Sequence, residues 1–182
     1  MRARDSQRKR VYASDHALVR IAKPLRTTEE IERFVKRVFG MKRIADAFPR
    51  SRLPGWLPEV RDGRGRRRAG GCASYITMPL WSRNEAIVLH ELAHTICQRE
   101  HGDATGHGWQ FCAIYLTLTL HAMGREAHDV LKAAFKENRV RYTAPRVRKP
   151  MDPARKAELV ARLAAYRAAQ TRTAPEVSPE PS

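Results

Sequence analysis

Apolar side chains recur every three or four residues in several stretches of the chain, which is the spacing of one face of an α-helix. The first stretch begins after Thr27, stops at Gly40 and has a basic outer face. Two later stretches predict helices from about Gly108 to Met123 and from Arg125 to Glu137. Residues 115–120 alternate as a strand would, but the run around them is long and uninterrupted up to Gly124, which favours a buried helix.

A fourth helical stretch lies between Ser82 and Gly102 and contains no proline or glycine. Ser82 and Glu85 have the spacing of a capping box, with serine at the N-cap and glutamate three residues later. The sequence therefore predicts a helix that begins at this box. Its apolar residues are Ile87, Val88, Leu89, Leu92, Ala93 and Ile96.

Alternating patterns predict a few short strands. Val11 to Ala22 alternates weakly and indicates one or two strands. Glu59 to Arg61 predicts another, and Asp62-Gly63 is a turn signal that leads into a strand within Arg67 to Pro79. Together with the helices these strands predict an α+β domain, in which a small antiparallel sheet packs on the fourth stretch and on the buried helix.

The chain of 182 residues is long enough for one domain with tails. We expect the domain in residues 1–140, with the charged residues 1–10 loosely held. A basic linker and a C-terminal helix that begins at Asp152-Pro153 are expected in residues 141–170. Residues 171–182 are rich in proline, serine and glutamate, which predicts a disordered tail.

The net charge of +16 is distributed unevenly. Residues 1–70 contain 20 Lys or Arg against 8 Asp or Glu, whereas residues 71–124 contain 2 against 4. Basic flanks favour a polyanionic partner, with nucleic acid first. An arginine-rich solvated surface accounts for the same charges equally well.

The three cysteines are widely spaced and form no Cys-x-x-Cys pair, which argues against a disulfide framework and for a reducing compartment. No signal peptide is visible, and the longest apolar run is too short to span a bilayer. These features predict a cytoplasmic protein that is not inserted in a membrane.

The candidate chemistry lies in the fourth helical stretch, as His90-Glu91-Leu92-Ala93-His94. On a helix, His90 and His94 are one turn apart on one face and can bind a single Zn²⁺ ion. Glu91 is then placed to take a proton from a water that the zinc activates. The alternative is a buried helix whose two histidines are hydrogen-bonded core residues, which leaves Glu91 unexplained.

A catalytic zinc usually has three protein ligands, so a third must come from elsewhere. Our candidate is His107, in a Gly-His-Gly segment at the start of the next helix. The rival is His101, which lies at or just beyond the end of the motif helix. His121 and His128 are interpreted as structural or surface histidines.

Three segments together resemble the SprT-like (Spartan-type) zinc metalloprotease domain. They are Gly70-Gly71-Cys72-Ala73-Ser74-Tyr75-Ile76, the His90 to His94 motif, and Gly106-His107-Gly108 followed by Phe111. The segment from Asp5 to Ala13 is also similar to a small family of metallohydrolases from actinobacteria and their phages. These resemblances imply a minimal zincin-like (gluzincin-type) fold, with His90, His94 and His107 as zinc ligands and Glu91 as general base.

The resemblance also implies a function. Spartan-type members cut proteins that are crosslinked to DNA, and their activity depends on DNA. This chain has a shorter loop before His107 and no zinc ribbon. The expected function is a zinc metallopeptidase that acts on a protein or peptide substrate, which can add as a strand to an exposed sheet edge beside the metal.

Two other functions stay open. One is a zinc hydrolase of a non-peptide bond, because the motif does not select the bond that is cleaved. The other is a basic nucleic-acid-binding protein with a structural or vestigial zinc site. For the enzyme, the sequence offers Tyr75, Tyr115, His121 and Arg125 as candidates to stabilise an oxyanion.

Overall fold

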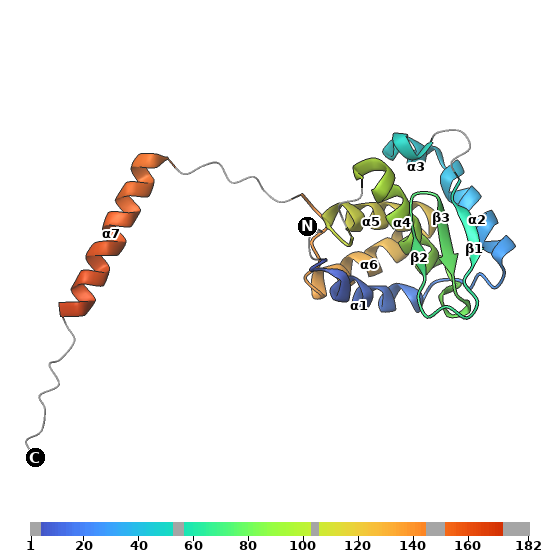
Figure 1. Ribbon diagram of the computed structural model, residues 1–182, viewed down its shortest axis with the longest axis horizontal. Helices are drawn as coiled ribbons and strands as arrows, with labels where there is room; N and C mark the ends of the chain where they lie inside the picture. The colour runs from blue at the N-terminus through green and yellow to red at the C-terminus, as the bar shows by residue number, and fades with distance from the viewer. Residues whose placement is uncertain (1–4, 53–56, 103–105, 145–151, 173–182) are drawn as a thin grey trace, which may run out of the picture. The chain divides into compact units, whose positions relative to one another are not determined.

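The computed structural model describes residues 5–52, 57–102, 106–144 and 152–172. The chain divides into two compact units, residues 1–144 and 145–182. The described part of the first unit is α+β, with six α-helices and a three-stranded mixed sheet (Figure 1). Its elements are α1 (Arg8–Val19), α2 (Thr28–Gly40), α3 (Lys42–Ala47), η1 (Pro49–Arg52), β1 (Glu59–Asp62), β2 (Gly70–Gly71), β3 (Tyr75–Met78), η2 (Leu80–Ser82), α4 (Glu85–His101), α5 (Trp109–Ala122) and α6 (Arg125–Glu137).

Three of the predicted helices are confirmed within a residue or two. Thr27 is the N-cap of α2, and its hydroxyl accepts a hydrogen bond from the backbone N–H of Glu30. The alternating residues 115–120 lie inside α5, which is mostly buried. Helix α6 has the predicted bounds. The short helices α3 and η1 were not predicted, because the prolines nearby indicated only breaks.

The capping box predicted for the motif helix is wrong in its register. The N-cap is Asn84, whose side-chain oxygen accepts a hydrogen bond of 3.0 Å from the N–H of Ile87. Glu85 is therefore the first residue of α4. The hydroxyl of Ser82 instead donates to the carbonyl of Pro79 within η2.

The N-terminal segment differs most from its prediction. The strands expected in Val11 to Ala22 are absent from this described segment, which forms helix α1. Its buried residues Val11, Ser14, Asp15 and Leu18 have helical spacing, and the Ser14 hydroxyl donates to the carbonyl of Ala134 on α6. Residues 5–10 are not loosely held either, because the Gln7 side chain hydrogen-bonds to the backbone of His107 and Arg141. Packing on α6 overrides the weak alternation.

The sheet is mixed, which corrects the antiparallel sheet expected from the sequence. Its strand order is β1-β3-β2, with β1 parallel and β2 antiparallel to β3. The chain does reverse direction after β1, at Gly63 to Arg66, but β3 lies between the two strands that this turn connects. The physical reason is burial, since three of the four residues of β3 are buried whereas β1 is largely exposed. Consequently β2, and not β3, is an edge strand beside α4.

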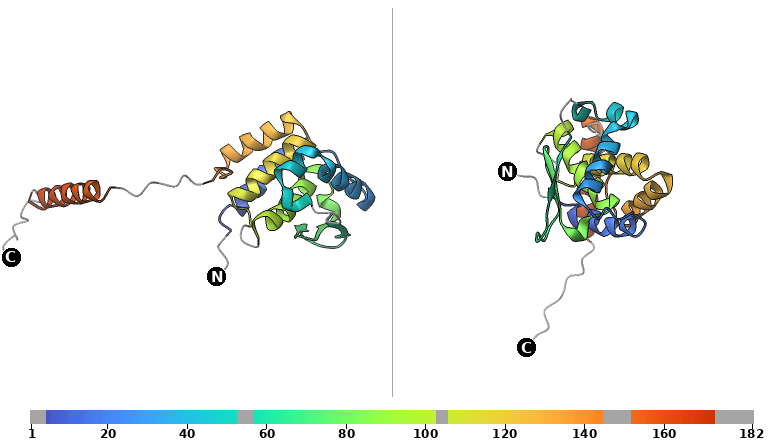
Figure 2. Two further views of the ribbon diagram at one scale, coloured as in Figure 1. Left: turned by 90° about the horizontal axis from the view of Figure 1, so that it is seen from above. Right: turned by 90° about the vertical axis from the view of Figure 1, so that its right-hand side faces the viewer.

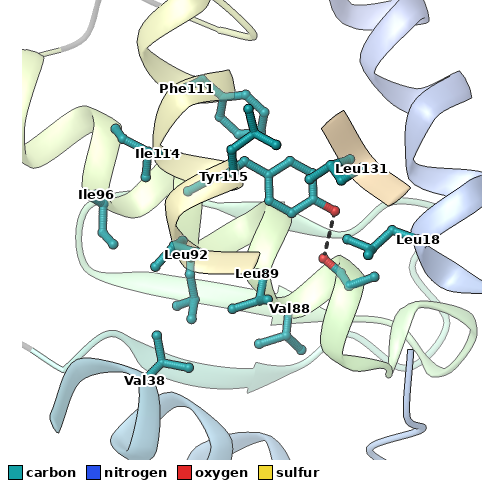
Figure 3. Packing of buried hydrophobic residues seen from close by; sticks show 14 of the residues in the cluster. Leu18, Val38, Val88, Leu89, Leu92, Ile96, Phe111, Ile114, Tyr115 and Leu131 are labelled. Carbon is teal, nitrogen blue, oxygen red and sulfur yellow. Dashed lines mark hydrogen bonds between the residues drawn. The ribbon is translucent and has the colours of Figure 1, made fainter. Parts of the chain in front are cut away.

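The helices of the first unit lie on one face of the sheet (Figure 2). Helix α4 is in contact with β2 and β3 on one side and with α5 on the other. Tyr115 is fully buried in the centre of this packing, and its hydroxyl donates to the carbonyl of Ala86 on α4 (Figure 3). Apolar residues from α1, α2, α5 and α6 complete the core, so the motif helix is held on all sides.

In the second unit, helix α7 (Pro153–Arg172) begins at the predicted Asp152-Pro153. The backbone N–H of Ala154 donates to the Asp152 carboxylate. The linker residues 145–151 and most of the predicted tail lie outside the described residues. Among the helices that are described, none is long and apolar enough to cross a membrane.

Gly71 brings the edge strand β2 against the motif helix. A Cβ atom added at Gly71 would overlap the backbone carbonyl of Glu91, whereas one added at Gly70 would meet nothing within 4 Å. We expect Gly71→Ala to destabilise the protein by about 2 kcal/mol, since a shift of backbone against backbone is needed. Gly70→Ala is the matched control. Thermal unfolding should show a Tm lowered by about 4–8 °C for the first variant only, and equal Tm values would contradict this close approach.

Candidate metal centre

Three histidines, two from α4 and one from the turn before α5, converge at one point. Helix α4 supplies His90 and His94, and His107 precedes the first turn of α5. The ligand nitrogens of the three lie within 4.8 Å of one another, and Nε2 of His90 is 3.1 Å from Nε2 of His107. The structure thus brings together the three histidines predicted from the sequence, in a group that can hold one metal ion.

The opposite nitrogens of two of these rings face carboxylates. Nδ1 of His107 donates a hydrogen bond of 2.7 Å to Asp5, because an ionised carboxylate can only accept. Nδ1 of His90 lies 3.0 Å from Asp15 in an ion-pair contact whose angle is outside that of a regular hydrogen bond. Both carboxylates favour the proton on Nδ1. The two Nε2 atoms then present lone pairs to the same point, as metal ligands do.

The three imidazoles differ in how readily they take a proton. Burial, and then the positive charges of His90 and His107, lower the pKa of His94 to about 2. Burial and the charge of His90 also lower the pKa of His107, against the opposing effect of Asp5. Burial lowers the pKa of His90 as well, but the combined effect of Asp15, Glu91 and Asp5 outweighs burial and the pKa is raised. His94 and His107 therefore stay neutral at pH 7, the state that a metal requires.

The donor set fits zinc. Two nitrogen ligands about 2.1 Å from a tetrahedral zinc lie about 3.4 Å apart, close to the 3.1 Å between the Nε2 atoms of His90 and His107. If both Nδ1 atoms keep their protons, the paired lone pairs repel each other unless a cation lies between them. A proton on Nε2 of His90, whose pKa is raised, serves the same purpose, so binding of a metal to the pair would release that proton.

Glu91 is buried beside this group, with 6% of its surface exposed. Burial raises the pKa of its carboxyl to about 7, and Asp15 contributes in the same direction against the opposing charge of His90. A bound dication would bring the pKa back towards its ordinary range and favour the ionised form. In that state Glu91 is an ionised carboxylate, which can accept a proton.

The rival histidines lie outside the group. His101 is the exposed last residue of α4. His121 is in the last turn of α5, about 18 Å along the helix from Trp109 at 1.5 Å per residue. His128 hydrogen-bonds to its neighbour Asp129. Of the seven histidines, three form the group among the described residues that can hold a metal, namely His90, His94 and His107.

Sequence reasoning missed the contribution of the N-terminal segment. Asp5 and Asp15 contact two of the three histidines, and the ring of Tyr12 lies 5.6 Å from that of His90 and 5.1 Å from that of His107, between centroids. A signal was present in the sequence, because Asp15 occupies an inward position when residues 11–18 are placed on a helix. An acidic residue on the buried face of a helix needs a partner.

A cavity of about 180 Å³ opens beside His94. Its wall includes Gly71, Cys72 and Gln98. The turn between β2 and β3 is tied to α4 there, since the Thr95 hydroxyl donates to the carbonyl of Cys72 and Gln98 accepts from the N–H of Ala73. The edge strand is thus fixed next to the three histidines.

We expect Asp15→Asn to weaken zinc binding by about 10- to 100-fold, because the carboxylate orients His90 and keeps the proton on its Nδ1. Asp129→Asn is the matched control, since Asp129 contacts a histidine outside the group. Competition with a chromophoric chelator would measure both affinities, with circular dichroism to verify folding. Equal affinities in the two variants would show that Asp15 does not act on the metal site.

Comparisons with protein-family models, with curated proteins and with solved structures found no match to this chain.

Proposed function

We propose that the chain is a zinc-dependent metallopeptidase of the SprT-like type, with His90, His94 and His107 as ligands. The observation that carries the proposal is the convergence of three imidazole nitrogens, two of them backed by carboxylates, next to the buried carboxyl of Glu91. A structural zinc site would usually have four protein ligands, whereas three leave a position free for chemistry.

Zinc bound there would polarise a carbonyl group and make water nucleophilic near pH 7. Glu91 takes the proton of the attacking water and then gives it to the nitrogen of the leaving amine. Its position supports this role, because Glu91 directly follows the ligand His90 in α4 and is buried beside the three histidines. Asp5 and Asp15 hold the two rings in position throughout.

Two features beside the histidines support a peptide substrate over other hydrolysable compounds. Strand β2 is at the edge of the sheet, and Gly71 within it is against the backbone of Glu91. An extended peptide added to this edge would pass close to the zinc ligands. The cavity beside His94 has room for a side chain of that peptide.

The test is cleavage of β-casein by the purified full chain that contains one zinc per molecule. We expect cleavage that stops when zinc is removed by a chelator and returns when zinc is restored. The assay is repeated with single- and double-stranded DNA. Absence of cleavage under all these conditions, with one zinc bound, would contradict the proposal.

A second candidate is nucleic-acid binding through the basic surface, alone or together with proteolysis. Four exposed arginines between β1 and β2 favour it (Arg64, Arg66, Arg67 and Arg68). Arginine clusters contact phosphates, and such binding weakens steeply as salt increases. A DNA titration at several salt concentrations tests it, and a response that is flat with salt would argue against phosphate contacts.

A further inference from the structure

Tyr12 lies on α1, beside the candidate metal centre. The buried neighbours Val11, Ser14 and Asp15 fix the orientation of the helix, while Tyr12 itself remains 48% exposed. Its ring is tilted by 34° against that of His90 and is edge-on to that of His107, at 80°. The side chain thus contacts two ligand rings and is also accessible to a substrate from solvent.

The phenol also lies within the electrostatic reach of Glu91. Burial and then the Glu91 carboxylate raise the pKa of Tyr12 above its usual value. A tyrosine phenol keeps its proton at neutral pH, because its ordinary pKa is about 10, and it can donate a hydrogen bond. A neutral donor close to the proton-transfer group can stabilise negative charge on a substrate oxygen.

The residues that the sequence suggested for stabilising an oxyanion either make other contacts or lie away from the three histidines. The Tyr115 hydroxyl is fully buried and donates to Ala86. The ring of Tyr75 is covered by the guanidinium of Arg61, 3.7 Å from its centroid. His121 and Arg125 lie at the far end of α5 and at the start of α6.

We propose that Tyr12 is a catalytic residue of this centre, whose phenol O–H donates a hydrogen bond to the substrate carbonyl oxygen as water attacks. The inference rests on the proposed function and adds to it the group that stabilises the oxyanion. The N-terminal segment then has two roles, since Asp5 and Asp15 position the ligand rings and Tyr12 contacts the substrate. No bond of Tyr12 forms or breaks, and its proton stays on the phenol.

The first test compares zinc-loaded wild type, Tyr12→Phe and the control Tyr142→Phe, whose ring stacks on Phe135. Phenylalanine keeps the ring that packs on His90 and His107 and removes only the hydroxyl. We expect Tyr12→Phe to bind one zinc and to lose about 10²- to 10³-fold in kcat on casein-derived peptides, with KM little changed. Tyr142→Phe should behave as wild type. An unchanged kcat in Tyr12→Phe would overturn the inference and leave the peptidase proposal standing.

A second readout does not depend on turnover. Acetohydroxamate is titrated into the cobalt-substituted proteins and followed by the visible absorption of the metal. We expect Tyr12→Phe to bind this probe roughly 10-fold or more weakly, because a hydrogen bond to a charged oxygen is lost. If wild type cleaves no peptide, the peptidase proposal fails, whereas this titration still tests Tyr12. Equal affinities, or loss of zinc from Tyr12→Phe, would overturn the inference and assign the side chain to holding the ligand rings.

Discussion

Glu91→Gln is expected to bind zinc as wild type does and to lose cleavage by about 10²- to 10⁴-fold, the usual contribution of a general base. Glutamine has the same shape as glutamate, so the packing of α4 against Gly71 and the three histidines is preserved. The amide cannot take a proton from water, and the proton-transfer step is therefore lost. Zinc content and casein cleavage are measured on the same preparation.

Glu126→Gln on α6 is the matched control, because Glu126 is an exposed carboxylate outside the three-histidine group. It should retain full activity. Wild-type cleavage by Glu91→Gln would move the general base to another group. If Glu91→Gln lost its zinc, the loss of cleavage would be explained by metal binding and not by proton transfer. The Glu91 side chain would then be assigned to the ligand set.

The central residues of the site could be predicted because they are close together in the sequence. His90 and His94 are four residues apart, so one helix is enough to place both rings on one face. Glu91 between them follows from the same helix. His107 was predictable because it lies at the start of the next predicted helix, and few residues separate it from α4, whose middle carries His90 and His94.

The carboxylates behind the histidines could not be predicted, because their positions depend on contacts between residues that are far apart in the sequence. Asp5 is 102 residues from His107, and Asp15 is 75 residues from His90. Their segment was expected to be loose or extended, since residues 1–10 are highly charged and residues 11–22 alternate weakly. The helix forms there because Val11 and Leu18 pack into the core, and this packing brings both carboxylates to the histidines.

The strand pairing of the sheet was predicted wrongly for a similar reason. An Asp-Gly turn between two candidate strands normally predicts a hairpin, and the chain does reverse there. The pairing is decided instead by burial, because β3 is the most apolar strand and takes the central position. The pattern of residues along the chain shows that a strand exists. Which strands pair depends on which of them stabilises the fold most when it is buried between two neighbours.

His107→Ala is expected to lower the zinc content of the purified protein clearly below one per chain. Removing a ligand should cost more than the 10- to 100-fold in affinity that is typical for a residue behind a ligand. His101→Ala and His121→Ala are the matched controls, because both side chains lie outside the three-histidine group. These two variants should keep one zinc per chain.

The measurement is zinc content after exhaustive dialysis, followed by a titration with cobalt, whose visible absorption reports the number of bound nitrogens. Because His107 is also held by Asp5 and its backbone by Gln7, His107→Gln is included to keep most of the side-chain volume. Both His107 variants should bind cobalt more weakly and with an altered spectrum, while their circular dichroism stays that of wild type. Undiminished zinc in both variants, with loss in His101→Ala or His121→Ala, would move the third ligand. Because Asp5 and Tyr12 are placed at the site through their contacts with His107, that result would also remove much of the basis for assigning roles to the N-terminal segment.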